Sequence, residues 1–287
     1  MTQETLKDFI SSIEMKDSQE RREKIIEQLE KIRCKYEIQT YPFESTEEYG
    51  HNIIVKLGAS ETKIIVGAHY DIAQGSGGAN DNGSGVSILL KFIQNIIKKS
   101  IKLNHSIEVI FFDHEETPES GARYYIKNCQ KENIKGMFNL DICGMGDTII
   151  FDDKGKSNNS IVQAVIQAIE FHQYDYTVMR ELPASDERQF DDVGIPNVQL
   201  AVIPREDVKL VTKLVAAQKE LRDALVNGYI TPREADKEIK IILGEESLPK
   251  LLRVMHTPDD LSIHLSETTM MMVLNAITEA VSRYSKM

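Results

Sequence analysis

The feature that most constrains the fold is a series of short, almost continuous apolar runs that alternate with amphipathic, helix-like segments. The runs KIIVGAH (63–69) and SIEVIFFD (106–113) are rich in β-branched and aromatic residues and carry few polar ones. Strands of this kind are buried on both sides, which happens when helices cover both faces of a parallel sheet. The alternation therefore predicts an α/β sandwich with a mixed, mostly parallel sheet flanked by helices.

The remaining elements follow from the same periodicity. Further strands are predicted at 51–57, 137–142, 174–179 and 197–203, with a hairpin-like stretch at 147–156. Helices are predicted as a pair within 2–34, and singly at 83–99, 119–129, 158–171 and 265–284. Because no internal repeat or linker interrupts this series, we expect a single domain over residues 1–287.

One long segment, at about 205–252, fits the sheet pattern less well. It is highly charged, and Val208, Val211 and Leu214 recur in it at helical spacing. We expect a helical hairpin inserted directly before His256. Two helices cannot bury all of this apolar surface against each other, so the surplus should pack on the domain or on another subunit. The insertion is therefore a candidate surface for a homo-oligomer, with packing on the domain itself as the alternative.

Charge and cysteine content exclude several classes of protein. Lys and Arg number 34 against 45 Asp and Glu, a formal net charge of −11, so nucleic acid is not an expected partner. Cys34, Cys129 and Cys143 are an odd, unpatterned set, which argues against a disulfide framework and against cysteine-ligated zinc. We find neither a signal-peptide core nor a stretch long enough to cross a bilayer, and expect a cytoplasmic protein without a membrane partner.

Polar residues of metal-binding type recur where the apolar strands end. Residues 69–71 (HYD) end one strand, residues 113–116 (DHEE) end another, and Asp141 ends a third. Asp81 lies in the turn-rich stretch 75–85. Sites in open α/β sheets form at the carboxyl ends of strands, and mixed imidazole and carboxylate ligands suit zinc, manganese or cobalt. Taken singly, each motif also has an ordinary interpretation as a turn, a helix cap or a solvated charge pair.

Together and in this order, the motifs resemble those of the M28 zinc aminopeptidases. The matching stretches are GAHYD (67–71), GANDNGSG (78–85), FFDHEETPESGARYY (111–125), NLDICG (139–144), SDERQFDDVGIPNVQL (185–200) and MHTPDDL (255–261). The resemblance extends from about residue 50 to the C-terminus. It implies a three-layer, phosphorylase/hydrolase-like sandwich fold. It also implies an enzyme that removes N-terminal residues from peptides.

The resemblance also implies a ligand set for two Zn²⁺ ions, with Co²⁺ or Mn²⁺ as alternatives. Asp81 would bridge both ions, since a carboxylate has two oxygens to share. His69 and Asp141 would complete one site, and Glu116 and His256 the other. Two ions that share a water lower its pKa and stabilise the tetrahedral intermediate.

Two further residues receive catalytic roles from the resemblance. Glu115 is expected to be the general base that passes a proton from the water to the leaving amine. Asp71 is expected to accept the second imidazole N–H of His69 and orient the ring. Relatives hold the peptide bond after the bridging aspartate in cis, so a cis Asp81–Asn82 bond is expected here.

The motifs are compatible with more than one substrate preference and reaction type. Asp186, Glu187 and Phe190 are the expected substrate-binding residues, and Glu187 departs from the histidine that many relatives have there. The alternatives are glutaminyl cyclisation or carboxypeptidase action on the same scaffold, and a non-catalytic binding module. All five ligand positions are kept, which argues against the binding module, and the insertion at 205–252 is too short for the dimerisation domain of M20-type peptidases.

Overall fold

The structure is a computed structural model. The model describes residues 5–43, 46–99, 104–118, 120–155, 159–226, 241 and 248–287. Within these ranges, no helix has both the length and the apolarity that crossing a membrane requires.

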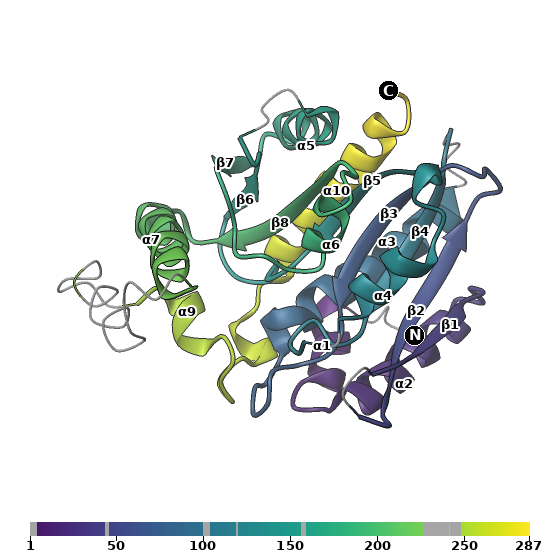
Figure 1. The fold of residues 1–287 in the computed structure, drawn as a ribbon, viewed down its shortest axis with the longest axis horizontal. Coiled ribbons are helices and arrows are strands. Elements are labelled where there is room, and N and C mark those ends of the chain that lie inside the picture. The colour runs from purple at the N-terminus through teal and green to yellow at the C-terminus, as the bar shows by residue number, and fades with distance from the viewer. Residues whose placement is uncertain are drawn as a thin grey trace.

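The described strands form one eight-stranded mixed sheet (Figure 1). In spatial order, the strands are β1 (Glu37–Pro42), β2 (Tyr49–Leu57), β4 (Ser106–Phe112), β3 (Lys63–His69), β5 (Ile134–Leu140), β8 (Asn197–Ile203), β6 (Thr148–Asp152) and β7 (Asp175–Met179). The four central strands β4, β3, β5 and β8 run parallel. Antiparallel pairs occur at β1–β2, β2–β4 and β6–β8. The predicted mixed, mostly parallel sheet is confirmed.

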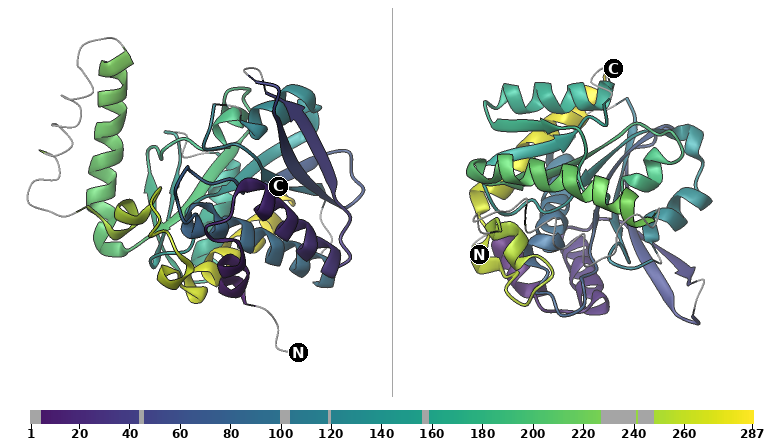
Figure 2. Two further views of the ribbon diagram at one scale, coloured as in Figure 1. Left: turned by 90° about the horizontal axis from the view of Figure 1, so that it is seen from below. Right: turned by 60° about the vertical axis from the view of Figure 1, so that its left-hand side comes forward.

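Helices cover both faces of this sheet and complete a three-layer sandwich (Figure 2). The longer helices are α1 (Leu6–Ile13), α2 (Ser18–Lys31), α3 (Gly85–Lys99), α4 (Gly121–Asn128), α5 (Ser160–Phe171), α7 (Val208–Val226) and α10 (Glu267–Tyr284). The shorter ones are α6 (Arg188–Asp191), α9 (Lys250–Val254), η1 (Ala79–Ser84), η2 (Lys131–Asn133), η3 (Arg205–Asp207) and η4 (Ser262–His264). Helices α1, α2, α3, α5 and α10 pack on one face, and α4, α6 and α7 pack on the other.

The central strands are apolar along their whole length because both of their faces are covered. In β3, Ile64, Val66 and Ala68 join the core under α3 and α10, whereas Ile65 joins the core under α4. All four side chains are 0% exposed. At about 25 cal/mol per Å² of apolar surface removed from water, burial of such side chains is the main source of stability for the sandwich.

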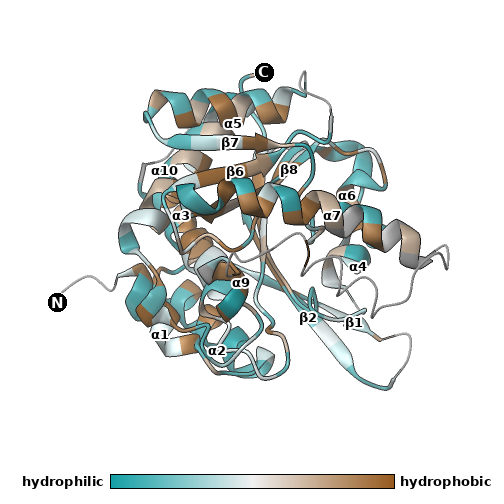
Figure 3. Ribbon diagram, turned by 90° about the vertical axis from the view of Figure 1, so that its left-hand side faces the viewer, coloured by the Kyte–Doolittle hydropathy of each residue, from teal (hydrophilic) through white to brown (hydrophobic). Residues whose placement is uncertain are grey.

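The inserted segment begins as predicted. Helix α7 lies within it, and Figure 3 shows apolar and polar residues alternating along this helix. Val211 and Leu251, from α7 and α9, pack against Ile150 and Ala201 of the sheet. Part of the apolar stripe is therefore buried against the domain itself. The second predicted helix lies outside the described residues.

Candidate metal centre

The expected site lies at the carboxyl-terminal end of the sheet, where three parallel strands end side by side. His69 is the last residue of β3, Asp141 follows the end of β5, and the segment 113–116 follows β4. These strands are neighbours in the order β4–β3–β5. Their carboxyl ends bring together side chains that are up to 72 positions apart in sequence, counting from His69 to Asp141.

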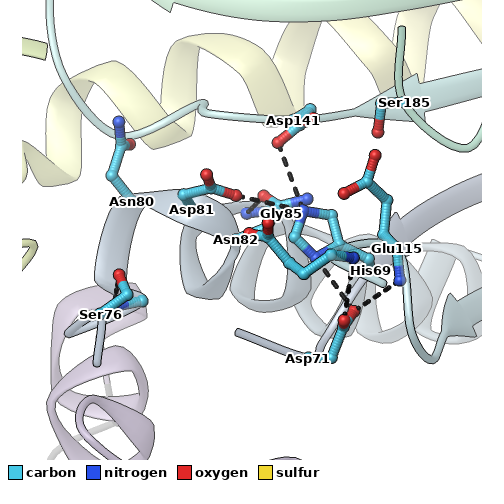
Figure 4. Close-up of polar contacts among 12 residues, drawn as sticks. His69, Asp71, Ser76, Asn80, Asp81, Asn82, Gly85, Glu115, Asp141 and Ser185 are labelled. Atoms are coloured by element: carbon cyan, nitrogen blue, oxygen red, sulfur yellow. Dashed lines mark hydrogen bonds and ion pairs between the residues drawn. The ribbon is translucent and has the colours of Figure 1, made fainter. Parts of the chain in front are cut away.

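The carboxylate of Asp81 lies between the two histidines that the sequence singles out. Its Oδ1 lies 3.2 Å from Nε2 of His69, and its Oδ2 lies 3.0 Å from Nε2 of His256. Asp141 Oδ1 lies 3.6 Å from the same His69 nitrogen, and Glu116 Oε2 lies 3.3 Å from the same His256 nitrogen. Figure 4 shows Asp81 and Asp141 directed toward His69. The five expected ligands therefore form two groups that share Asp81.

These spacings suit zinc. Four donors at 2.0–2.1 Å from a tetrahedral ion lie about 3.3 Å from one another, and the observed separations scatter around that value. Asp141 Oδ1 and Glu116 Oε1 are buried and accept no hydrogen bond within the part of the chain that the structure describes. Burying a carboxylate oxygen without a donor is costly unless a cation neutralises it. The residues present therefore fit a metal centre.

The loop that carries Asp81 is tied to the segment after β5. The Asp81–Asn82 peptide bond is cis, as predicted. Asn82 Nδ2 donates to the carbonyl of Leu140 at 2.8 Å, and the N–H of Gly144 donates to Asn80 Oδ1 at 2.7 Å. These bonds fix the position of Asp81 relative to Asp141.

Asp260 holds the same loop from the other side and was not singled out from the sequence. Its two oxygens accept the main-chain N–H groups of Asn80 at 2.8 Å and of Asp81 at 3.0 Å. It lies four residues after His256 in the stretch MHTPDDL, which was the available signal. Burial raises the pKa of Asp260 to about 6, against the opposing effect of these two N–H donors.

Asp71 contacts the expected ligands His69 and Glu116 and the expected base Glu115. Its oxygens accept the N–H groups of Glu115 at 3.0 Å and Glu116 at 3.1 Å, and Oδ1 lies 3.3 Å from Nδ1 of His69. Figure 4 shows Asp71 on the far side of the His69 ring from Asp81 and Asp141. One carboxylate thus holds the main chain of Glu115 and Glu116 by hydrogen bonds and contacts the His69 ring, on the side where outer partners orient metal-bound imidazoles.

Negative charge dominates the centre. Burial raises the pKa of Glu115 to about 8; His69 opposes this, while Asp141, Glu116 and Asp71 reinforce it. Hydrogen bonds to Asp81 and Glu116 raise the pKa of His256 to about 10. A bound dication would offset this excess of carboxylate charge and compete with the protons on both histidines.

The expected substrate-binding residues lie in two different places. Asp186 is 1% exposed, and neither of its carboxylate oxygens has a hydrogen-bond partner in the described ranges. Burial raises its pKa well above the ordinary value, and the charge of Glu115 adds to the effect. Phe190 is 0% exposed and packs in the core, with ring centroids 6.3 Å from Phe112 and 6.2 Å from Tyr125.

Glu187 is also enclosed, at 3% exposed. Its Oε2 accepts from Nδ2 of Asn139 at 3.3 Å, and burial raises its pKa to about 7, against the opposing charge of Lys154. The expected roles of Asp186, Glu187 and Phe190 toward substrate stay predictions.

Fold and site together define an α/β protein with a carboxylate-rich, two-histidine metal centre, and comparison with known proteins gives its family. Residues 52–281 match the model of peptidase family M28. The chain therefore belongs to peptidase family M28. It is 25% identical over 239 residues to leucine aminopeptidase 2 of Trichophyton rubrum, covering 80% of this chain and 43% of that protein.

Solved structures share the fold. A zinc aminopeptidase from Bacillus subtilis aligns with a TM-score of 0.62 and 22% identity, covering 82% of this chain and 50% of that one. A glutaminyl cyclase from Porphyromonas gingivalis aligns with a TM-score of 0.66 and 18% identity, covering 97% of this chain and 93% of that one. The chain spans less than half the length of the first curated relatives it matches, between 14% and 43% of each.

Proposed function

We propose that the protein is an aminopeptidase that binds two zinc ions and removes single residues from the free N-terminus of peptides. The observation that carries the proposal is the position of Asp81, whose two oxygens face Nε2 of His69 and Nε2 of His256 at 3.2 and 3.0 Å. His69, Asp141 and one oxygen of Asp81 would hold one ion. His256, Glu116 and the other oxygen would hold the second.

The remaining side chains supply proton transfer and orientation. Bound zinc ions supply an activated water and polarise the scissile carbonyl. Glu115 directly precedes the expected ligand Glu116, and a carboxylate at this position can accept a proton from the attacking water and later release it. Its main-chain N–H is held by Asp71 at 3.0 Å. Glu115 takes the proton of the attacking water and delivers it to the departing amine.

A preference for a free N-terminus follows from the surplus of carboxylates. Asp186 adds a buried carboxyl group that has no hydrogen-bond partner among the described residues and interacts electrostatically with Glu115. A positively charged α-ammonium group is attracted to such a cluster, whereas an acetylated terminus carries no charge and adds bulk. The positive end of a peptide is thereby directed to the centre, so that residues are removed one at a time from the N-terminus.

Glutaminyl cyclisation is the second candidate. It is favoured by the alignment with the glutaminyl cyclase of Porphyromonas gingivalis, which extends over nearly the whole of both chains. A cyclase needs a buried carboxyl to move protons between the α-amine and the leaving ammonia, and Glu115 or Asp186 meets that need as well.

One assay separates the two candidates. Zinc-loaded protein is incubated with a panel of aminoacyl fluorogenic amides, each with a free or an acetylated amine, and with an N-terminal glutaminyl peptide. An aminopeptidase releases fluorophore from the free amides only, and a cyclase releases ammonia from the glutaminyl peptide without cleaving a peptide bond. Release of C-terminal residues would indicate a carboxypeptidase.

The matched control is Glu115→Gln, which keeps the size of the side chain and lacks the titrating carboxyl. Activity that persists unchanged in Glu115→Gln comes from a contaminating peptidase or from another site. Absence of all three activities in protein that binds zinc would contradict the proposed function.

A further inference from the structure

A buried arginine lies beneath the loop that carries Asp81. Arg21, in α2, is 0% exposed. Its guanidinium donates to four main-chain carbonyls, namely Ile13 at 3.2 Å, Tyr70 at 3.2 Å, Gly77 at 3.4 Å and Gly78 at 2.6 Å. Among the described residues, none of its hydrogen bonds goes to a carboxylate. Tyr70 directly follows the expected ligand His69, and Gly78 lies three residues before the expected ligand Asp81. Arg21 therefore contacts the backbone close to both ligands.

The Asp81 loop is held on both of its polar edges. Arg21 donates hydrogen bonds to the carbonyl groups of Gly77 and Gly78. The segment 257–260 accepts hydrogen bonds from N–H groups of the same stretch, including that of Gly77, which donates to the carbonyl of Thr257 at 2.9 Å. Gly78 has φ +66°, and a Cβ there would collide with the guanidinium. The glycine is therefore what allows Arg21 to come this close.

The N-terminal helices also hold the segment that follows His256. The N–H of Ser262 donates to Glu14 Oε2 at 2.6 Å, and the N–H of Met15 donates to the carbonyl of Gly77 at 2.8 Å. Figure 1 shows α1 and α2 packed beside this part of the chain. The family match begins only at residue 52, so these helices lie outside it while contacting both loops that carry ligands.

The charge of Arg21 is balanced at a distance by the carboxylates of the centre. Burial lowers its pKa to about 10, while Asp71 and Asp260 act to raise it, so it stays cationic at neutral pH. If Arg21 acted on zinc only through its charge, it would weaken binding, because like charges repel. If it acts by holding the loop, it strengthens binding. The two roles predict opposite effects of removing it.

We propose that Arg21 is a positioning residue of the metal centre, which fixes the backbone at Tyr70, Gly77 and Gly78 and thereby the placement of His69 and Asp81. This inference rests on the proposed zinc centre. It makes the helices α1 and α2 a functional part of the site, through hydrogen bonds to main-chain atoms.

The test compares the full-length protein with Arg21→Met and Arg21→Lys. Zinc affinity is measured by competition with a chromogenic chelator, and the visible absorption spectrum of the Co²⁺-loaded protein reports ligand geometry. Outer partners of metal ligands typically contribute 10–100-fold to affinity. Arg21→Met should therefore bind zinc about 10–100-fold more weakly and alter the Co²⁺ spectrum, with Arg21→Lys between it and the wild type.

The control is Ile25→Ala, one helical turn further along α2, where the side chain is 0% exposed in the core and no hydrogen bond is removed. It lowers stability but should leave zinc affinity and the Co²⁺ spectrum of the folded protein unchanged. Unchanged or tighter zinc binding by Arg21→Met, with a wild-type spectrum, overturns the inference, as does an equal loss of affinity in Ile25→Ala. If Arg21→Met does not fold, Arg21→Lys is judged by the same criteria. Wild-type protein that binds no zinc overturns the proposed function itself.

Discussion

Replacement of Asp71 by asparagine tests the support of the centre. In the wild type, the two carboxylate oxygens accept the N–H groups of Glu115 at 3.0 Å and of Glu116 at 3.1 Å. Asparagine keeps the size of the side chain but has only one oxygen, so one of these N–H groups would face an NH₂ group instead. A buried donor left without an acceptor costs about 1–3 kcal/mol of folding stability. Misplacement of Glu116 and of the His69 ring should weaken zinc binding by about 10–100-fold.

The assay is zinc titration with chelator competition, together with kcat and KM at saturating zinc and the free energy of unfolding from urea denaturation. At saturating zinc, kcat should still fall, because the backbone of Glu115 is no longer held. Asp113→Asn is the matched control, since Asp113 is also buried and accepts one main-chain N–H, that of His51 at 2.8 Å, but does not contact His69. Zinc affinity and kcat that stay at wild-type values in Asp71→Asn would refute this reasoning.

Three other predictions follow from the same structure. Glu115→Gln should lower kcat by about 10²–10⁴ with zinc content unchanged; a loss of zinc with the same turnover per bound ion would show that Glu115 is a ligand instead. Asp152 is 4% exposed, and burial raises its pKa to about 6 from 3.8, against the opposing charge of Lys154. Because ionisation is thus disfavoured in the folded state, Asp152→Asn should stabilise the protein by up to about 3 kcal/mol at pH 8, with the gain vanishing as the pH falls below about 4; equal urea-unfolding differences from wild type at pH 8 and pH 4 would contradict this. Because the insertion ends close to His256, we expect it either to wall the site or to join subunits. Replacing residues 207–247 by a short Gly/Ser linker should therefore raise the rate on a long peptide relative to a dipeptide, or reduce the size measured by light scattering. If both stay unchanged in a folded variant, the insertion has neither role.

The parts of the fold that were predicted are those with strong local periodicity. The strands β3 and β4 and the helices α3, α5 and α10 lie within a few residues of their predicted bounds. Strand β1 was not predicted, because it is a largely exposed edge strand that ends at Pro42. Its assignment depends on pairing with β2, a contact between strands that periodicity does not encode.

The stretch 147–156 shows the same limit. Its turn residues Asp153 to Gly155 suggested a hairpin, but β6 pairs with β8 and β7, which come much later in the chain. Strand order depends on long-range packing, whereas turn chemistry is local. The hairpin interpretation was wrong for that reason.

The ligand set was available from the sequence because its spacing resembles a family pattern, whereas the supports were less visible. Asp260 accepts two main-chain N–H groups, and Arg21 donates to four carbonyls. Contacts to main-chain atoms leave no signature in the partner residues. For Arg21, the one available signal was its place in line with Ile25 and Leu29 on the buried face of α2. Cytoplasmic location, single-domain organisation and oligomeric state stay predictions.

The central claim is that Asp81 joins two zinc ions, and metal content measured by mass spectrometry tests it most directly. Wild-type protein dialysed against a limited excess of zinc should retain about two ions per chain, as in other two-metal sites. His256→Ala should lose mainly one ion, and Asp81→Ala should lose stoichiometric binding of both, since each oxygen of Asp81 faces a different histidine. Equal zinc content in wild type and Asp81→Ala would contradict the account.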